Sequence, residues 1–349
     1  MSLLTNGLTA RGERLWTSCL LIHFVPTARR NRAPDPWRSH YEDRTLFQNG
    51  HTARLGCYVH QDEVMDLATS CVAFLTAHGV VRATAIANAL FPQSTRGFLE
   101  GGVATQEMLA KMLEGLTAGT FEPVTVPAAE VRFHAPIHDP GKFICIGLNY
   151  TDHAAETGNP APSEPPVFPK WNTAILDPDE PILRPRGETR LDWEVELGVV
   201  IGKTARYVSK EQALDYVYGY TIINDASARD FQFVTSQWAA GKMGDTLAPI
   251  GPYIADKTEI PDPHVLDLKT WVNGTLMQYG NTRNFIFDVR YLVSYLSQLL
   301  TLSPGDLIAT GTPAGVGFSR QPPVVLQPGD TVRLEITGLG VLENSVKDA

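Results

Sequence analysis

The stretch Leu191-Asp192-Trp193-Glu194-Val195-Glu196-Leu197-Gly198-Val199-Val200-Ile201-Gly202 alternates apolar residues with others over most of its length. Successive side chains of an extended strand point to opposite faces, so every second residue from Trp193 to Ile201 forms one apolar face. Glu194 and Glu196 share the other face, with about 7 Å between them along the strand. We therefore predict a strand that carries a pair of carboxylates.

Two interpretations of this acidic face remain open. Hard divalent cations prefer oxygen ligands, so Glu194 and Glu196 could form part of a metal site. Alternatively, the strand buries only its apolar face and the glutamates are ordinary exposed charges. The stretch alone does not decide between them, and other segments would have to supply the remaining ligands.

The composition excludes several classes of protein. The chain has 349 residues, enough for one large domain and a smaller one. Its hydrophobic fraction of 43% and charged fraction of 19% are typical of a globular protein. A net charge of −9 argues against nucleic-acid binding as the main function. We expect no nucleic-acid partner.

The four cysteines are scattered and form no CxxC pair (Cys19, Cys57, Cys71 and Cys145). This usage fits a reducing compartment and gives no zinc pattern. No run of 18 or more apolar residues is present, so we expect no membrane span. The sequence predicts a soluble intracellular protein, with the choice between cytoplasm and mitochondrion left open.

The sequence predicts three segments. Residues 1–52 form an extension in which arginines outnumber acids, and a mitochondrial targeting segment and a disordered tail both remain open. Residues 53–134 form a small α/β domain, with strands at 54–59 and near 61–65 and helices at 65–77, 81–90 and 105–116. Residues 135–349 are dominated by strands, predicted at 143–147, 191–202, 217–223, 250–254, 266–272, 307–310 and finally 331–336, with helices at 209–216 and 287–300.

Further residues in the third segment suggest chemistry. Asp225 follows the strand at 217–223 and could complete a site of three carboxylates, although aspartates in such positions often cap helices or start turns. His153 and Glu156 are three residues apart and would share a helical face, where the carboxylate could orient the imidazole to activate a water. The alternative is an ordinary surface hydrogen bond.

Two other signals are weak when taken singly. Residues 311–317 are rich in glycine at a strand end, where backbone N–H groups can face an anion, but an ordinary turn would look the same. Lys170 and Lys242 have apolar or small neighbours, which suits partial burial against an anionic ligand. A solvated lysine is the simpler interpretation of each.

Together these segments resemble the fumarylacetoacetate hydrolase family. The matching segments keep the order and approximate spacing of the family over residues 142–345, and they are residues 147–156, 193–202, 225–230, Gln232, Lys242, 272–274 and 310–317. Residues 321–326 look most like the mitochondrial domain-containing branch of that family. Two departures concern the segment Pro169–Thr173 around the lysine and the first 50 residues, for which the family offers no counterpart.

The resemblance implies an α+β, mainly β fold. The C-terminal catalytic domain would consist of rolled mixed β-sheets with short helices, preceded by a small N-terminal α/β module, and the protein would be a homodimer. The resemblance also implies a role for each site residue. Metal ligands for Mg²⁺ or Mn²⁺ would be Glu194, Glu196 and Asp225, catalytic residues His153, Glu156 (a water-activating pair on a mobile lid) and Lys242, and substrate-binding residues Lys170, Gln232, Thr312 and Arg229.

From this resemblance we predict a metal-dependent enzyme that acts on small 2-oxo (β-diketo) acids through a metal-bound enolate. The leading reaction is hydrolysis of a C–C bond in an acylpyruvate or fumarylpyruvate. Keto–enol tautomerisation or decarboxylation of oxaloacetate is the alternative, because it needs the same cation and the same enolate. A ligand-binding relic of the fold without catalysis is a third hypothesis.

Overall fold

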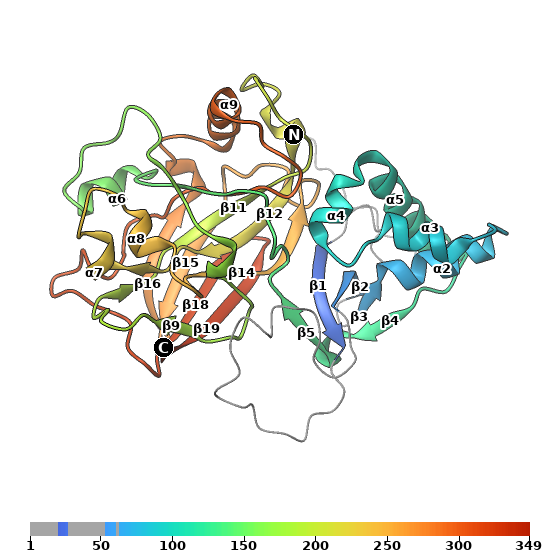
Figure 1. The fold of residues 1–349 in the computed structure, drawn as a ribbon, viewed down its shortest axis with the longest axis horizontal. Coiled ribbons are helices and arrows are strands. Elements are labelled where there is room, and N and C mark those ends of the chain that lie inside the picture. Colours follow the sequence, from blue (N-terminus) through green and yellow to red (C-terminus); the bar gives the residue numbers. More distant parts are fainter. Residues whose placement is uncertain (1–19, 27–52, 61–62) are drawn as a thin grey trace, which may run out of the picture. The chain divides into compact units, whose positions relative to one another are not determined.

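The computed structural model describes residues 20–26, 53–60 and 63–349 (Figure 1). The chain divides into two compact units, Met1–Arg132 and Phe133–Ala349, close to the predicted boundary after residue 134. Strand β5 (Val131–His134) spans the division. Most of the predicted extension, including any targeting segment, lies outside the described residues.

The first unit combines a small antiparallel sheet with helices. Its strands follow the order β4-β3-β2-β1, and their bounds are β1 (Leu20–Pro26), β2 (Arg54–His60), β3 (Glu63–Asp66) and β4 (Thr125–Pro127). The helices are α2 (Leu67–Ala77), α3 (Ala83–Leu90), α4 (Thr95–Glu100) and α5 (Gly102–Ala118). Strand β1 corrects the prediction that residues 1–52 are all an extension, because Leu21, Ile22 and Phe24 are fully buried.

The first sheet of the second unit contains β11, the strand that carries Glu196 and directly follows Glu194. Neighbouring strands follow the order β14-β12-β11-β17-β6-β7. All neighbours pair antiparallel except β17 and β6, which are parallel. The bounds are β6 (Phe143–Ile146), β7 (Val167–Pro169), β11 (Val195–Ile201), β12 (Val217–Asn224), β14 (Ala248–Asp256) and β17 (Leu307–Ala309), with β8 (Ile175–Leu176) parallel to β14.

A second sheet in this unit has the order β16-β15-β18-β19-β9. Its strands are β9 (Ile182–Arg184), β15 (Asp267–Val272), β16 (Thr275–Asn281), β18 (Thr331–Ile336) and β19 (Gly340–Asp348). The Asn273-Gly274 turn joins β15 to β16, which confirms the predicted hairpin. Strand β19 shows that residues 331–336 are not the last strand. Strands β10 (Leu191–Asp192) and β13 (Ser227–Ala228) form a separate short pair.

Helices of the second unit are short. They are α6 (Thr151–Glu156), α7 (Arg229–Gln232), α8 (Ala239–Lys242) and α9 (Val289–Leu299), with 3₁₀ turns η1 (Ala128–Glu130), η2 (Asn172–Ala174), η3 (Ala213–Tyr216) and η4 (Thr282–Asn284) elsewhere in the chain. The helix predicted at 209–216 is wrong, because only its last four residues form a 3₁₀ turn. Figure 1 shows α6, α7 and α8 gathered at one side of this unit. The predicted fold of mixed sheets with short helices is confirmed.

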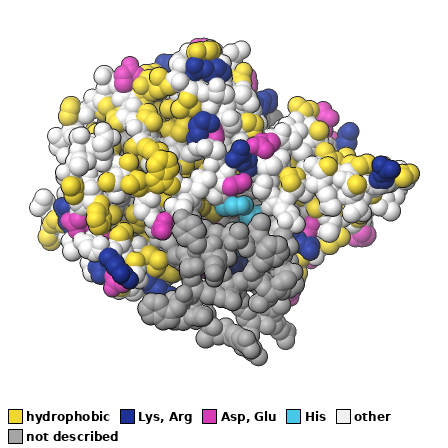
Figure 2. Space-filling model, viewed as in Figure 1, with side chains coloured by type: hydrophobic (Ala, Val, Ile, Leu, Met, Phe, Trp, Pro, Cys, Tyr) yellow, Lys and Arg dark blue, Asp and Glu magenta, His cyan; other side chains and the backbone are white. Residues whose placement is uncertain are grey.

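Two observations bear on the function classes considered above. None of the helices within the described ranges is long and apolar enough to cross a membrane. On the face drawn in Figure 2, the lysines and arginines of the described residues are scattered among acidic and uncharged side chains. The described residues on that face therefore form no basic stripe of the kind that binds a nucleic-acid backbone.

Candidate active site

Pairing of β11 with β12 brings three carboxylates together. Val195 lies opposite Asn224 in this antiparallel pair, so Glu194 and Asp225 face each other directly beyond it. The Asp225 backbone N–H donates to the Glu194 carbonyl at 2.9 Å. Glu196, two residues further along, points to the same side. One carboxylate oxygen from each of Glu194, Glu196 and Asp225 lies within 4.8 Å of the other two.

These carboxylates are withdrawn from solvent. Glu194 is 5% exposed, Glu196 1% and Asp225 0%, and every residue of β11 is buried. The interpretation of the glutamates as an exposed charged face is therefore wrong. Buried carboxylates without water need cations or hydrogen-bond donors close by, because an unpaired buried charge is strongly destabilising.

Two lysines supply part of that compensation. The Lys242 Nζ atom lies 2.7 Å from Glu194 Oε2 and 2.8 Å from Asp225 Oδ2, and so bridges the two acids. The Lys170 Nζ atom lies 2.8 Å from the other carboxylate oxygen of Asp225, Oδ1, and donates to three backbone carbonyls. The Lys170 side chain is fully buried behind Asp225 and does not line the pocket, which differs from its predicted contact with substrate.

Arg229, at the start of α7, provides the third cation. Its Nη2 atom lies 2.7 Å from Glu194 Oε1 and 2.8 Å from Asp192 Oδ2. Its Nη1 atom donates to Gln232 Oε1 at 2.8 Å, which fixes the amide so that its nitrogen is the remaining hydrogen-bonding group. Arg229 thus orients both a predicted metal ligand and a predicted substrate-binding amide.

The two glutamates have opposite pKa shifts. Burial raises the pKa of Glu194, but the charges of Lys242 and Arg229 outweigh burial and lower that pKa to about 2. Burial, reinforced by the negative charges of Asp225 and Glu194, raises the pKa of Glu196 well above its usual range. Within one small cluster, Glu194 is therefore held ionised while Glu196 favours its protonated form.

His153 and Glu156 form the predicted pair on α6. The His153 Nδ1 atom lies 2.8 Å from Glu156 Oε1, and the backbone N–H of Gly315 donates to Glu156 Oε2 at 2.9 Å. The His153 side chain is only 8% exposed, so the pair is not a surface hydrogen bond. A carboxylate at Nδ1 fixes the tautomer that leaves Nε2 free to accept a proton.

Asn149 holds the turn that leads from β6 into α6. Its Nδ2 atom donates to the carbonyls of Phe287 and Thr310, and its Oδ1 atom accepts the Phe287 N–H. These bonds attach the start of α6 to the end of β17. Asn149 therefore places His153 close to the carboxylates.

The glycine-rich loop after β17 completes the wall. Gly311 donates its N–H to Glu196 Oε2 at 2.8 Å, with a φ of +98°. A Cβ at this position would lie 2.6 Å from the Asn149 Cβ, so the loop needs glycine for both reasons. The Thr312 hydroxyl donates to a β11 backbone carbonyl at 2.9 Å and accepts from Gln278 Nε2 at 2.8 Å. The loop is thus attached to β11.

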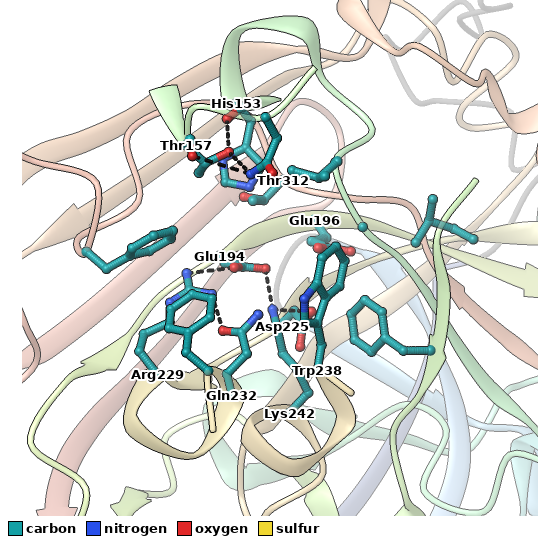
Figure 3. A pocket seen from close by; sticks show the side chains of 17 residues that line it. His153, Thr157, Glu194, Glu196, Asp225, Arg229, Gln232, Trp238, Lys242 and Thr312 are labelled. Atoms are coloured by element: carbon teal, nitrogen blue, oxygen red, sulfur yellow. Dashed lines mark hydrogen bonds and ion pairs between the residues drawn. The ribbon is translucent and has the colours of Figure 1, made fainter. Parts of the chain in front are cut away.

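Many of these groups line one pocket of about 480 Å³, part of which is open to solvent. In Figure 3, His153, Thr157 and Thr312 lie on one side of Glu194, and Arg229, Gln232 and Lys242 lie on the other. The structure brings most of the predicted site residues to the pocket wall, namely His153, Glu194, Glu196, Asp225, Arg229, Gln232, Lys242 and Thr312. Glu156 orients His153 and does not itself line the pocket, and Lys170 lies behind Asp225.

Asp192 is a residue whose importance sequence reasoning missed. Its Oδ2 atom accepts from Arg229 Nε at 3.0 Å and Nη2 at 2.8 Å. Its two oxygens also accept the backbone N–H groups of Trp193, Gly317 and Phe318 at 2.7–3.1 Å. The only sequence signal is its place two residues before Glu194, and no pattern distinguishes it from other polar residues.

The donor set fits a hard divalent cation. Three buried carboxylates from two adjacent segments present oxygens within 4.8 Å of one another, and no thiol or imidazole belongs to this set. Oxygen-only sets of this kind suit Mg²⁺ and Mn²⁺ better than softer metals. Glu194, Glu196 and Asp225 are thus the residues that would hold the ion.

Comparison with known proteins points to one family. The sequence profile of the family described as "Fumarylacetoacetate (FAA) hydrolase C-terminal" matches residues 142–347. A protein of Burkholderia ambifaria with a provisional hydrolase name is 51% identical over 232 residues, which cover 65% of this chain and 82% of that protein. This relative is bacterial, so the predicted likeness to the mitochondrial branch is not supported.

Two solved structures give further comparisons. The 2-hydroxyhepta-2,4-diene-1,7-dioate isomerase of Mycobacterium marinum is 42% identical with a TM-score of 0.58, covering 65% of this chain and 82% of that one. The maleylpyruvate hydrolase of Sphingobium sp. SYK-6, solved with manganese(II) and pyruvate, is 30% identical with a TM-score of 0.64, covering 85% and 96% of the two chains.

Proposed function

The chain belongs to the fumarylacetoacetate hydrolase family, and we propose from this premise that it hydrolyses a C–C bond in small 2-oxo acids that carry a second carbonyl group. The observation that carries this proposal is one pocket lined by three carboxylates suited to a divalent cation and by a histidine whose tautomer is fixed by Glu156. The neighbour solved with manganese(II) and pyruvate supports the same assignment of ion and product class.

A bound Mg²⁺ or Mn²⁺ would supply positive charge that stabilises the negative charge developing on the 2-oxo acid during cleavage. Glu194, Glu196 and Asp225 would hold the ion. Lys170 and Arg229 keep Asp225 and Glu194 in place through ion pairs of 2.8 and 2.7 Å. Preorganised ligands of this kind need no rearrangement during the reaction.

Side chains of the pocket carry out the remaining steps of the reaction. His153 Nε2 takes a proton from a water, and the water oxygen attacks the carbonyl carbon distal to the carboxylate. The bond between that carbon and the neighbouring CH₂ breaks, and its electron pair moves into the 2-oxo acid fragment. Lys242 and Gln232 donate hydrogen bonds to that fragment, which then takes up a proton. The products are a carboxylic acid and pyruvate, so one water is consumed for each bond cleaved.

Purified protein tests this proposal in a panel of three assays, each with Mn²⁺ and with EDTA. The assays follow acylpyruvate cleavage, oxaloacetate tautomerisation and oxaloacetate decarboxylation. We expect acylpyruvate cleavage that depends on the metal and that falls by about 10²–10⁴ in His153→Ala. Cleavage at the wild-type rate in His153→Ala with metal bound would contradict the role given to the histidine.

A second candidate is isomerisation without bond cleavage, of which oxaloacetate keto–enol tautomerisation is an example. It is favoured by the solved neighbour named as an isomerase, with 42% identity. The same pocket serves both reactions, because a proton shift next to the 2-oxo group also passes through an enolate. Tautomerisation that exceeds cleavage in the same panel would establish this candidate. Metal binding without turnover of any 2-oxo acid would instead indicate a ligand-binding relic.

A further inference from the structure

The pocket has two chemically different ends. Its polar end contains the three carboxylates, Arg229 and Lys242. The rest of the wall is largely apolar, and its large side chains are Ile146, Leu148, Phe168, Phe233, Trp238 and Phe318. Thr157 and Asn159, whose side chains are hydrogen-bonded to each other, also line the pocket and are uncharged. A substrate whose 2-oxo acid group binds at the polar end must place its other end against this apolar wall.

The aromatic side chains flank the polar end from two sides. Phe168 packs edge-on against Trp238 at 6.1 Å between ring centroids, with Lys242 Nζ 5.5 Å from the Phe168 ring. Phe233 and Phe318 lie 5.5 Å apart, with the Arg229 guanidinium 4.3 Å from the Phe318 ring. The aromatic rings thus begin where the charged groups end.

Gly147 fixes one of these aromatic walls. A Cβ at Gly147 would lie 2.3 Å from the Trp238 ring, so the indole packs directly on the backbone. Trp238 therefore occupies space that any larger residue at 147 would take. The apolar wall is a fitted part of the pocket and does not depend on a loose surface side chain.

Charges in the wall match a substrate with one negative charge. Among the described residues that line the pocket, Arg229 and Lys242 are the cations, and each already contacts carboxylates. With all three carboxylates ionised around a bound cation, they and the two basic side chains give the wall a formal charge of −1. A divalent cation would turn this into +1, which one substrate carboxylate neutralises. Among the described residues, a second carboxylate against the apolar wall would meet no unpaired cation, because Arg190, whose guanidinium lies 6.0 Å from the Phe233 ring, is paired with Asp230 at 2.6 Å. It would also lose part of its hydration there.

We propose that the site selects 2-oxo acids with a single carboxylate and an uncharged, mainly apolar group at the other end, and that it discriminates against dicarboxylic 2-oxo acids. This inference rests on the proposed function, because it assumes that the 2-oxo acid group binds at the polar end. Within that function it favours acylpyruvates with apolar acyl groups over fumarylpyruvate and oxaloacetate.

The test compares 2-oxohexanoate with 2-oxoadipate, which have equal numbers of carbon atoms and differ in the terminal carboxylate. Isothermal titration calorimetry of the Mn²⁺-saturated full-length protein near neutral pH gives the Kd of each ligand without turnover. We expect 2-oxohexanoate to bind at least about tenfold more tightly. Equal or tighter binding of 2-oxoadipate would overturn the inference and leave the proposed function intact. Binding of neither ligand to the manganese-loaded protein would overturn both.

Asn159 allows a gain-of-function control on the uncharged part of the pocket wall. It lines the pocket but is exposed, so Asn159→Arg adds a cation at little risk to the fold. We expect this variant to reduce the preference for 2-oxohexanoate by about fivefold or more, and Asn159→Gln to leave the preference unchanged. If Asn159→Arg lowered the Kd of both ligands equally, this part of the pocket wall would not discriminate between ligands by their terminal charge.

Discussion

Strands β11 and β18 belong to the same unit, but they place charged residues in opposite surroundings. Every residue of β11 is buried, whereas buried and partly exposed residues alternate along β18. Arg333 and Glu335 on β18 form an ion pair at 3.2 Å with side chains 40% and 37% exposed. Water can replace either partner there. The charges around β11 are compensated by one another and by backbone groups and not by water, so they should behave as one coupled charge cluster in stability and in function.

The largest effect is expected from Asp225→Asn, which removes the carboxylate at the centre of this charge cluster. The carboxylate contacts Lys170 and Lys242 at 2.8 Å each, and the amide would leave the buried Lys170 ammonium without a counter-charge and Lys242 with Glu194 alone. We expect a loss of about 3–5 kcal/mol in the free energy of unfolding, together with loss of Mn²⁺ binding and of activity. Urea denaturation and calorimetric Mn²⁺ titration measure these effects. Wild-type stability in this variant would show that the charges do not depend on one another.

His153→Ala should separate catalysis from stability in the same pocket. The imidazole contacts Glu156 but none of the three carboxylates, so its loss leaves the cations paired. We expect kcat for acylpyruvate cleavage to fall by about 10²–10⁴ while Mn²⁺ affinity stays within about threefold of the wild type. A parallel fall in Mn²⁺ affinity would mean that His153 also takes part in metal binding.

Asp192→Asn tests how far the coupled charge cluster extends from the pocket. The residue accepts two hydrogen bonds from Arg229, which in turn holds Glu194. Loss of this charge should let Arg229 shift and should weaken Mn²⁺ binding by about 10–100-fold. Calorimetry measures the affinity, and Asp192→Glu serves as the charge-conserving control. Unchanged Mn²⁺ affinity in Asp192→Asn would confine the coupled charge cluster to the residues that would hold the ion.

The opposite pKa shifts of the two glutamates predict opposite effects of pH on the metal-free protein. With its pKa raised, folded Glu196 binds a proton more tightly than the unfolded chain does, so its contribution to stability falls as pH rises above about 4.5. Glu194 has its pKa lowered to about 2, so its contribution is present above about 4.5 and is lost as pH falls toward 2.

The variant Glu196→Gln isolates the first effect. In EDTA, its melting temperature should fall less with rising pH than that of the wild type. Mn²⁺ should bind the wild type more tightly at higher pH, because the ion displaces the proton of Glu196. Calorimetry in buffers of different ionisation enthalpy measures the protons released. Identical pH profiles for wild type and variant would contradict the raised pKa.

The sequence predicts which residues belong to the charge cluster better than it predicts the contacts between them. Alternation places Glu194 and Glu196 on one face, and this prediction is confirmed by their shared cluster. Alternation does not fix the register that sets Glu194 opposite Asp225, because register depends on the whole sheet. The predicted strand is also interrupted, since Trp193 and Glu194 lie between β10 and β11.

Lys170 and Asp192 show why the rest could not be predicted. Three backbone carbonyls from distant segments converge on the Lys170 ammonium, and no local pattern reports such convergence. Asp192 accepts the backbone N–H groups of Gly317 and Phe318, which lie more than 120 residues away in the chain. Residue type identifies groups able to carry chemistry, but long-range packing decides whether each faces the pocket or supports it.

The smallest effect is expected on the outer face of β18. Glu335→Gln removes a carboxylate of the same type as Glu196, on a strand of the same unit, but one whose side chain water reaches. The free energy of unfolding should change by less than about 0.5 kcal/mol, and Mn²⁺ affinity should not change. Urea denaturation beside Asp225→Asn makes the comparison direct. A loss of several kcal/mol in Glu335→Gln would mean that burial on both faces is not what couples the charges around β11.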